Sequence, residues 1–580
     1  MSRAEDMGTY IETDVLVIGG GFAGIWAAIR AKDFAGRVLL VDKAKVARSG
    51  CSTFAAGIQF CPTPEDDFDV WKREIVESGD YFPDQDWVDV FLKNQMERIM
   101  DYEKWGAPLE KDEKGKIARI VGRGHKNTRL FQFHGPKLMD LLRKKAIVKG
   151  VNLLERVMVS ELLTSDGQHP TEGRVTGAVG FNTQTGEFFI IKAGVTVMAA
   201  GPPCGKRGNV VDNDTGDGLA ASFRAGAELV NMEFLTAGNI TVWQRKGEAA
   251  GINMLQGHGA FFVNALGERL MEKYDPVLME RSLLYRICMG FAKESMEGRG
   301  PIYVDMRHLP AETFAKFRRV LPRTMMFWDE LGVDVTREKI ECTPHWGVTN
   351  SSGQGGIKVN LSCQTNLPGL YAAGGVTRVP IQGIYALGGI ATASCNVLGY
   401  IAGENAAGDT GAAKEGELDL KQVASLRSAI FEPEKRKEGP SPASFFERLD
   451  RETVPAPFSM FKSQGRIIKA LSRIDRIKGS MVDIAAPDYH ELTRANEFKN
   501  FIQCAELVFR ASLERQESRQ SHYREDFPYR DDVNWLKLIV MKREKTALTL
   551  NYEPISFQNW SVKPPPPRKI SHPVQMFIGD

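Results

Sequence analysis

A glycine-rich turn near the N-terminus constrains the fold of this chain more than any other feature. The apolar run 14–18 has the composition of a buried parallel strand, the turn G-G-G-F-A-G follows at 19–24, and a helical stretch covers 25–31. A second apolar strand, 38–41, ends at Asp42. Together these elements predict a complete βαβ unit and therefore an α/β fold.

The same turn has the chemistry of a dinucleotide site. Gly19 permits the tight turn, Gly21 lets the backbone approach a pyrophosphate, and Gly24 lets the helix pack against the strand. The N–H groups at the start of the helix, around Phe22 and Ala23, offer a partial positive charge to the phosphates. The competing interpretation is a glycine-rich turn that binds nothing, but the strand, helix and terminal acid favour dinucleotide binding.

Further segments favour FAD over NAD. Asp42 ends the second strand, where a carboxylate accepts hydrogen bonds from ribose hydroxyls. The small, polar segment 48–57 allows a bulky ring to lie against the backbone, and the glycine-rich segment 383–391 begins another helix, whose N-terminus could face the O2/N1 region of a flavin. An enzyme with NAD alone would not need this second segment so far downstream. The other predicted FAD contacts are Lys43, Ser49, Gly50, Ser52, Thr53, Ala56, Gly57, Ala200, Gly201, Asp217, Gly374, Gly375, Ala386, Gly389 and Ile390.

The rest of the chain divides by composition. Strand-like runs at 195–201 and 369–375 both end in glycine, and a mixed α/β module lies between them. From about 409 helical periodicity dominates, and 496–517 is an amphipathic helix. We expect a discontinuous nucleotide-binding domain (1–227 and 355–408), an inserted domain (228–354), a helical domain (409–548) and an extended tail (549–580).

Charge and cysteine content exclude several classes of protein. The net charge is +2, which gives no reason to expect a nucleic-acid partner. The eight cysteines are scattered without a C-x-x-C pair, so no iron–sulfur cluster or structural zinc is encoded locally, and a reducing cytoplasm is favoured. A strand that begins near Asp14 leaves no room for a signal peptide, and no run reaches the ~20 apolar residues of a membrane helix. We expect a cytoplasmic protein that reaches a membrane only through partners.

Four blocks of sequence, in order, carry a family resemblance. They are the turn with V-D-K-A and R-S-G, the G-E-R-L-M-E-K-Y-D-P block at 267–276, L-Y-A-A-G-G with A-L-G-G-I-A, and E-S-R with H-Y-R-E-D-F-P at 517–528. The chain resembles the flavoprotein subunits of the succinate dehydrogenase, fumarate reductase and adenylylsulfate reductase superfamily. The resemblance implies a Rossmann-type FAD-binding domain, an inserted α/β capping domain, a C-terminal helical domain and an iron–sulfur partner. Relatives with covalent FAD place a histidine where Ser52 stands, so FAD should be noncovalent here.

The substrate segments depart from the family. F-H-P-T-G of the dicarboxylate-using relatives becomes F-L-T-A-G at 234–238, R-G-E-G-G becomes Q-G-H-G-A at 256–260, and H-G-A-N-R-L becomes Q-G-I-Y-A-L at 382–387. Burying a dianion without neighbouring cations costs roughly several kcal/mol for each unpaired charge. We therefore expect a substrate less anionic than fumarate, with a C=C bond conjugated to one carbonyl, in an acyl thioester or a monocarboxylate.

Three residues are candidate catalytic groups. Arg286 resembles the second arginine of the family's R-D-x-x-x-R, which delivers a proton to the substrate carbon. His258 could resupply that proton, because its ordinary pKa suits proton exchange at neutral pH. His345 resembles the family's active-site histidine. The competing interpretations are a helix-surface salt bridge for Arg286, a loop histidine in water for His258, and a buried histidine bonded to backbone for His345.

Two alternative functions stay open at this point. The stretch 181–193 leans toward the adenylylsulfate reductase branch, so the chain could be a divergent form of the flavin-carrying (alpha) chain of that enzyme, in which flavin N5 attacks sulfur. The missing anion anchors are also compatible with an electron-transfer subunit whose substrate pocket is inactive.

Overall fold

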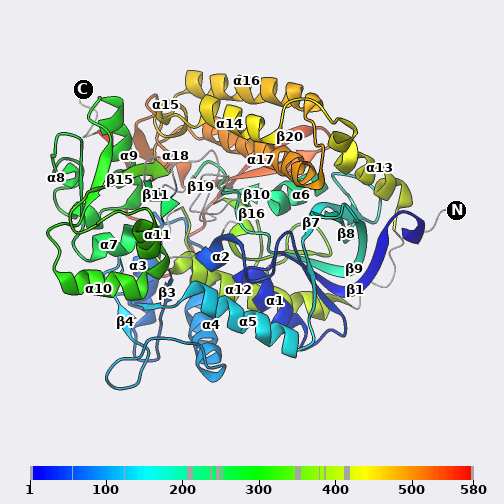
Figure 1. Ribbon diagram of the computed structural model, residues 1–580, viewed down its shortest axis with the longest axis horizontal. Coiled ribbons are helices and arrows are strands. Elements are labelled where there is room, and N and C mark those ends of the chain that lie inside the picture. The colour runs from blue at the N-terminus through cyan, green and yellow to red at the C-terminus, as the bar shows by residue number, and fades with distance from the viewer. Residues whose placement is uncertain are drawn as a thin grey trace.

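The computed structural model describes residues 4–54, 57–122, 124–204, 213–234, 238–242, 248–249, 252–345, 355–377, 379–384, 387–410 and 418–575. In Figure 1 the blue and cyan helices of the N-terminal part lie in the lower part of the view, and the C-terminal helices, in yellow and orange, lie together at the top.

The main sheet has the strand order β6-β2-β1-β9-β8-β7, and β17 pairs with the end of β9. Strands β6, β2, β1, β9 and β17 are parallel, whereas β7 and β8 run antiparallel to their neighbours. The long strand β9 pairs with β1 along one edge, and along its other edge its first half pairs with β8 and its end with β17. The strands are β1 Thr9–Ile18, β2 Val38–Asp42, β6 Asn152–Glu155, β7 Val157–Thr164, β8 Val175–Asn182, β9 Phe188–Met198 and β17 Leu370–Ala372.

Helix α1 (Phe22–Ala31) and helix α12 (Ile390–Gly408) cover one face of this sheet, next to α4 (Gln85–Lys104) and α5 (Gly135–Val148). The close approach of α1 and α12 depends on two glycines. A Cβ at Gly399 would lie 2.3 Å from the Ala23 carbonyl oxygen, and one at Gly403 would lie 2.2 Å from that of Ala27. These glycines bring the two segments of the nucleotide-binding domain into direct backbone contact, although they are far apart in the sequence.

The inserted segment builds its own sheet, in the order β12-β11-β15-β14-β13, around a separate apolar core. We call this part the cap. Figure 1 shows it as a unit to one side of the main sheet. Its elements are β11 Gly238–Val242, β12 Glu248–Ala249, α7 Ile252–Gly257, β13 Phe261–Val263, α8 Leu270–Tyr274, α9 Leu284–Met296, β14 Ile302–Asp305, α10 Ala311–Val320, α11 Pro322–Glu330 and β15 Ile340–His345.

A small three-stranded sheet has the order β3-β5-β4, and its strand β3 packs against α12. Its strands are β3 Ile58–Phe60, β4 Arg119–Ile120 and β5 Leu130–Gln132, with α3 Phe68–Ser78 packed on α4. The Ile58 side chain contacts both the core of the nucleotide-binding domain and that of the cap. This sheet therefore connects the two parts of the molecule.

The C-terminal part is helical and packs on the main sheet through α6 (Asp217–Ala225). Its long helix α17 buries Phe498, Phe501 and Phe509 against α14 and α16. The predicted amphipathic helix 496–517 lies mostly within α17. The helices are α13 Leu420–Phe431, α14 Pro442–Thr453, α16 Gln464–Ser480 and α17 Tyr489–Glu514.

The end of the chain returns to the body of the molecule. Hairpin β19–β20 spans the expected domain boundary at 548/549 and pairs with β10, and β21 pairs with β18. Val562 exchanges two hydrogen bonds with the Gln85 side chain of α4. The tail thus packs against its own chain. The strands at the end of the chain are β18 Tyr529–Asp531, β19 Lys537–Glu544, β20 Ala547–Pro554 and β21 Lys569–Ser571; β10 is Leu229–Val230, and it also pairs with β16 (Gly356–Ile357).

The architecture confirms the predicted fold class: an α/β protein with a Rossmann-type domain, an inserted α/β module and a C-terminal helical region.

Candidate cofactor and substrate sites

The glycine turn joins the carboxyl end of β1 to α1, as the sequence predicts. Gly19 has φ +109°, and a Cβ there would lie 2.3 Å from the Ala199 carbonyl oxygen. A Cβ at Gly24 would lie only 1.7 Å from the Gly19 carbonyl oxygen. No side chain fits at either position, so both glycines are required for the strand, the turn and the helix to meet.

The start of α1 is arranged to receive an anion. Gly21 is the N-cap residue and has no side chain to cap the helix. The Phe22 N–H donates to Ser52 Oγ at 3.0 Å, so one donor of the first turn is used by the protein. The first-turn N–H groups of a helix have no intrahelical partner, and together with the helix dipole they suit a phosphate. The residues present therefore fit the pyrophosphate of FAD.

Asp42 lies at the end of β2, as expected. Its two carboxylate oxygens accept the Gly20 N–H at 2.6 Å and the Ala44 N–H at 2.7 Å. Burial raises the pKa of Asp42, although these two hydrogen bonds act in the opposite direction. The carboxylate is thereby fixed against the glycine turn, where its remaining lone pairs can accept ribose hydroxyls.

Lys43 and Asp217 form an ion pair beside Asp42. Lys43 Nζ lies 2.7 Å from Asp217 Oδ2 and 2.7 Å from Glu497 Oε1, and it donates to Thr215 Oγ1 at 3.0 Å. Burial alone would lower the pKa of Lys43, but the two carboxylates raise it overall. A small cavity of about 60 Å³ brings predicted FAD contacts together, since Gly19, Asp42, Lys43, Ala200 and Asp217 all line it.

The other predicted FAD contacts surround the same end of the sheet. Gly50, Ser52 and Thr53 lie in the short helix α2 (Gly50–Phe54), preceded by Ser49 and followed by Gly57. Gly201 follows β9, Gly374 and Gly375 follow β17, Gly389 is the N-cap residue of α12, and Ile390 is its first residue. A Cβ at Gly374 would lie 2.6 Å from that of Ala23, which places the late glycine block against α1. Ala56 and Ala386 lie outside the described residues.

Arg286 is the third residue of α9 in the cap. Its Nη1 lies 3.1 Å from Asp275 Oδ2, and the Ser282 hydroxyl donates to the same oxygen. Burial would raise the pKa of Asp275, but hydrogen bonds from Ser282, the Leu278 N–H and Arg286 hold it below its ordinary value. A charged acid therefore orients the arginine that the sequence identifies as a catalytic candidate.

His258 follows α7 and lines a pocket of about 260 Å³ between the cap and the small sheet. The pocket wall includes Ile58, Ile120 and Leu130, while Lys316 of α10 supplies a second basic group. Burial and the charge of Lys316 lower the pKa of His258, which favours the neutral imidazole. The described lining of this pocket contains basic, apolar and amide groups and no carboxylate.

His345 ends β15, where its backbone pairs with Gly238 of β11. Its side chain, and residues 235–237 and 385–386 of the altered family segments, lie outside the described part of the chain. Arg286, His258 and His345 thus come from three separate elements of the cap.

Three features escape sequence reasoning. Glu497 reaches Lys43 from α17, far along the chain, where it looks like an ordinary polar residue of an amphipathic helix. Lys316 is one of several basic residues on α10, and only the fold shows that it lines the pocket. Cys51 and Cys204 are isolated in the sequence, yet their sulfur atoms lie 3.5 Å apart.

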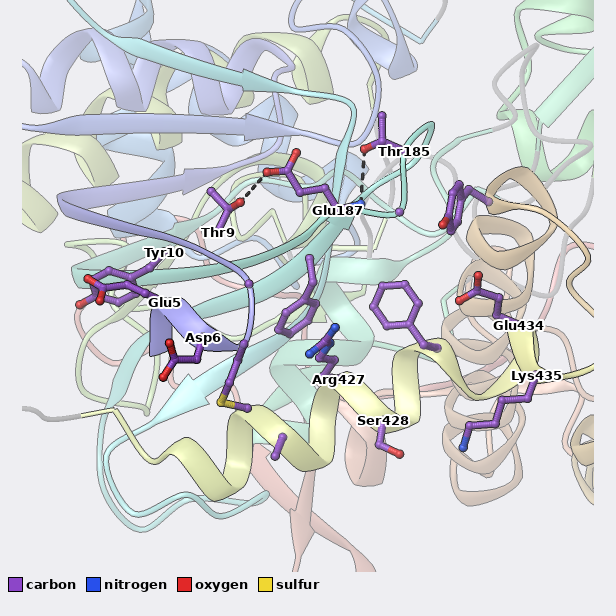
Figure 2. A pocket seen from close by; sticks show the side chains of 17 residues that line it. Glu5, Asp6, Thr9, Tyr10, Thr185, Glu187, Arg427, Ser428, Glu434 and Lys435 are labelled. Atoms are coloured by element: carbon purple, nitrogen blue, oxygen red, sulfur yellow. Dashed lines mark hydrogen bonds between the residues drawn. The ribbon is translucent and has the colours of Figure 1, made fainter. Parts of the chain in front are cut away.

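A larger surface groove, of about 1120 Å³, lies between the N-terminal strand and α13. Figure 2 shows that acidic side chains (Glu5, Asp6) and basic ones (Arg427, Lys435) share its lining. None of the predicted site residues lines it, and its charges are mixed, so we do not assign it to the redox site.

The parallel strands at the centre of the sheet, the glycine turn, the uncapped helix start and the terminal acid define a dinucleotide-binding protein. A family model described as "FAD binding domain" matches residues 14–392, and one described as "Fumarate reductase flavoprotein C-term" matches residues 451–570. The chain belongs to the fumarate reductase/succinate dehydrogenase flavoprotein family, binds FAD, and is an FAD-dependent oxidoreductase.

Individual relatives agree over nearly the whole length. An uncharacterized FAD-dependent oxidoreductase of Methanocaldococcus jannaschii is 30% identical over 92% of this chain and 97% of that protein. A fumarate reductase (CoM/CoB) chain of Methanothermobacter marburgensis is also 30% identical, over 92% of this chain and 97% of that protein. Among solved structures, E. coli quinol fumarate reductase gives a TM-score of 0.82 at 24% identity, over 98% of this chain and 99% of that one, which supports the fold.

Among the described helices, none combines the length and the apolar character needed to cross a bilayer.

Proposed function

We propose that this chain transfers electrons between an iron–sulfur partner protein and a small substrate with a C=C bond conjugated to one carbonyl, in a monocarboxylate or an acyl thioester. Bound FAD supplies the hydride chemistry at N5, and the protein supplies orientation, charge and protons. The proposed substrate differs from the dicarboxylates for which the relatives are named, because it carries at most one carboxylate.

The pocket beside His258 carries the proposal. Two basic residues, Lys316 and His258, line it from the cap, and Ile58, Ile120 and Leu130 line it from the small sheet. An amphipathic ligand with one anionic or strongly polar end matches this division, because each end finds a compatible surface. Its volume of about 260 Å³ suits a short organic acid or the acyl end of a thioester.

The altered family segments support the same conclusion. Leu235 and Ala237 stand where dicarboxylate-using relatives have a histidine and a threonine, and the segment 382–387 lacks a histidine and an arginine. A second carboxylate of the substrate would therefore meet fewer positively charged side chains in these segments than in the dicarboxylate-using relatives. Desolvating an unpaired charge costs roughly several kcal/mol, and this cost would select against fumarate.

The cap residues have distinct proposed roles. Arg286, oriented by Asp275, would donate a proton to the substrate carbon. Because an arginine is almost always charged, it needs a group to resupply the proton, and the neutral imidazole of His258 can relay one from solvent. His345 would contact the substrate from the end of β15.

An iron–sulfur partner is proposed because the flavin needs a source or acceptor of single electrons, and because the chain resembles a family with such partners. The sequence has no cysteine motif for a cluster of its own. Single electrons from such a partner would be collected as pairs on the flavin.

A stopped-flow experiment tests the substrate proposal. The FAD-loaded protein, reduced with stoichiometric dithionite, is mixed anaerobically with crotonate, crotonyl-CoA or fumarate, and flavin reoxidation is followed by absorbance. We expect crotonate or its thioester to reoxidise the flavin at least tenfold faster than fumarate. Equal or faster reaction with fumarate would refute the proposal, and bleaching by sulfite together with AMP-dependent turnover would favour adenylylsulfate chemistry instead.

A further inference from the structure

Two cysteines that are far apart in the sequence meet at the cofactor cradle, by which we mean Gly19–Gly24, Ser49–Thr53 and 200–204. Cys51 lies in α2, and Cys204 lies in the loop after β9. Their sulfur atoms are 3.5 Å apart, and neither forms a disulfide in this structure. Two thiols in contact need only a modest approach to form an S–S bond of about 2.05 Å.

Both cysteines are close in the sequence to predicted FAD contacts, and Asp214, which accepts hydrogen bonds from both backbones, lies against Gly50 and Gly201. Cys51 stands between Gly50 and Ser52, and the Ser52 hydroxyl accepts the Phe22 N–H at the start of α1. Cys204 follows Gly201, on the loop that leaves the carboxyl end of β9. The thiol pair therefore bridges two of the loops that surround the cofactor.

Asp214 fixes the arrangement. Its Oδ2 accepts the Cys51 N–H at 3.2 Å, and its backbone carbonyl accepts the Cys204 N–H at 2.7 Å. One carboxylate oxygen and both sulfur atoms lie within 4.8 Å of one another. The hydrogen bond to Cys204 and burial raise the pKa of the Cys51 thiol well above its ordinary value, which favours its thiol form.

The other buried cysteines have different surroundings. Cys363, Cys288 and Cys342 lie in three separate apolar clusters. The Cys51–Cys204 contact is thus a property of the cradle, and a buried cysteine from a core supplies a matched control.

We propose that Cys51 and Cys204 are a redox-active thiol pair that exchanges two electrons with the bound flavin. In the oxidising direction two S–H bonds break and one S–S bond forms. Oxidised FAD takes the two electrons and one proton to become FADH⁻, and the second proton leaves to solvent. The reverse reaction consumes FADH⁻ and restores both thiols. This activity goes beyond the proposed function and does not depend on the identity of the carbon substrate.

Peptide mapping and electron counting test the proposal on the FAD-loaded full chain. After aerobic oxidation, differential alkylation and mass spectrometry should find a Cys51–Cys204-linked peptide, which disappears after anaerobic reduction. Reductive titration with dithionite should consume four electrons per FAD in the wild type. It should consume two in Cys51→Ser and in Cys204→Ser, and four in Cys363→Ser.

Each contrary result has a clear meaning. Two electrons per FAD in the wild type, with no linked peptide, would overturn the proposal. One equivalent of bound zinc that depends on both cysteines would also overturn it, by identifying a metal site with Asp214 as third ligand. If the serine variants bind no FAD, the wild-type linked peptide and its reversal by reduction still decide the question.

Discussion

Arg286 and Asp275 form an ion pair inside the cap, with Nη1 and Oδ2 3.1 Å apart. The two residues belong to separate sequence motifs, since Asp275 ends the G-E-R-L-M-E-K-Y-D block and Arg286 ends R-S-L-L-Y-R. Their contact gives a structural reason for the presence of both motifs in one chain, because the acid of the first motif orients the arginine of the second.

Removing either partner should impair proton delivery while FAD remains bound. We predict that Arg286→Gln lowers kcat about 100-fold or more, because general-acid contributions are typically of that size. Asp275→Asn should lower kcat less, since the arginine is kept but is no longer held by a charged acid. The kcat of each variant is measured with a reduced viologen as electron donor and, as acceptor, the unsaturated acid or thioester that the wild type reduces.

A control on the same helix separates chemistry from cap stability. Lys293 of α9 pairs with Glu297, and Lys293→Gln should keep wild-type kcat. A large loss in this control, or an Arg286→Gln variant with full activity, would contradict the assigned role.

Gly21→Ala should fold but bind FAD at least tenfold more weakly. Gly21 has an ordinary φ of −80°, so alanine is tolerated by the backbone, but the new Cβ would lie 3.0 Å from Ser52 Oγ and crowd the pyrophosphate position. FAD titration of the apoprotein, followed by flavin fluorescence quenching, measures the affinity. Gly465→Ala in α16, where a Cβ meets nothing within 4 Å, is the matched control and should bind FAD normally.

Lys316→Met should raise KM for a monoanionic substrate with little change in kcat, because Lys316 lines the pocket but is not proposed to transfer protons. About a tenfold increase corresponds to the loss of one charge-assisted contact. Lys421→Met, which changes an exposed lysine of α13, serves as control. An unchanged KM in Lys316→Met would remove this pocket from the substrate site.

Buried Lys462 should make stability increase with pH. Burial and the charge of Arg524 lower its pKa to about 7, and its Nζ lies 3.4 Å from Ser512 Oγ. Between pH 7 and the ordinary lysine pKa near 10.5, the unfolded chain binds more protons than the folded one, so stability rises with pH across this window. Below pH 7 the destabilising contribution is constant. Each unit of pKa shift is worth about 1.4 kcal/mol.

The variant Lys462→Met should therefore be more stable than the wild type at pH 7, and the difference should shrink as the pH approaches 10.5. Thermal unfolding of both proteins from pH 7 to 10 measures this. Lys478→Met, at a surface lysine paired with Glu506, should show no such convergence. A constant difference between wild type and Lys462→Met would contradict the lowered pKa.

The sequence predicted the strand, turn and helix that would carry the cofactor half of the site, because their signals are local. Gly19, Gly24 and Asp42 occupy the positions that strand–turn–helix periodicity requires. The contacts made by Glu497 and Lys316, and the meeting of Cys51 with Cys204, were not predictable. Each depends on how distant elements pack, and an isolated lysine, glutamate or cysteine carries no local pattern. Substrate selection is hardest to predict for the same reason, since the candidate residues Arg286, His258 and His345 belong to separate elements of the cap and no local pattern links them.

The most direct test of the account is the flavin content of the purified full-length chain. The account predicts a yellow protein with close to one FAD per chain. Because Ser52 cannot form a histidyl bond, acid or heat denaturation should release all of the FAD into the supernatant. A colourless protein that takes up no FAD on reconstitution would contradict the central claim.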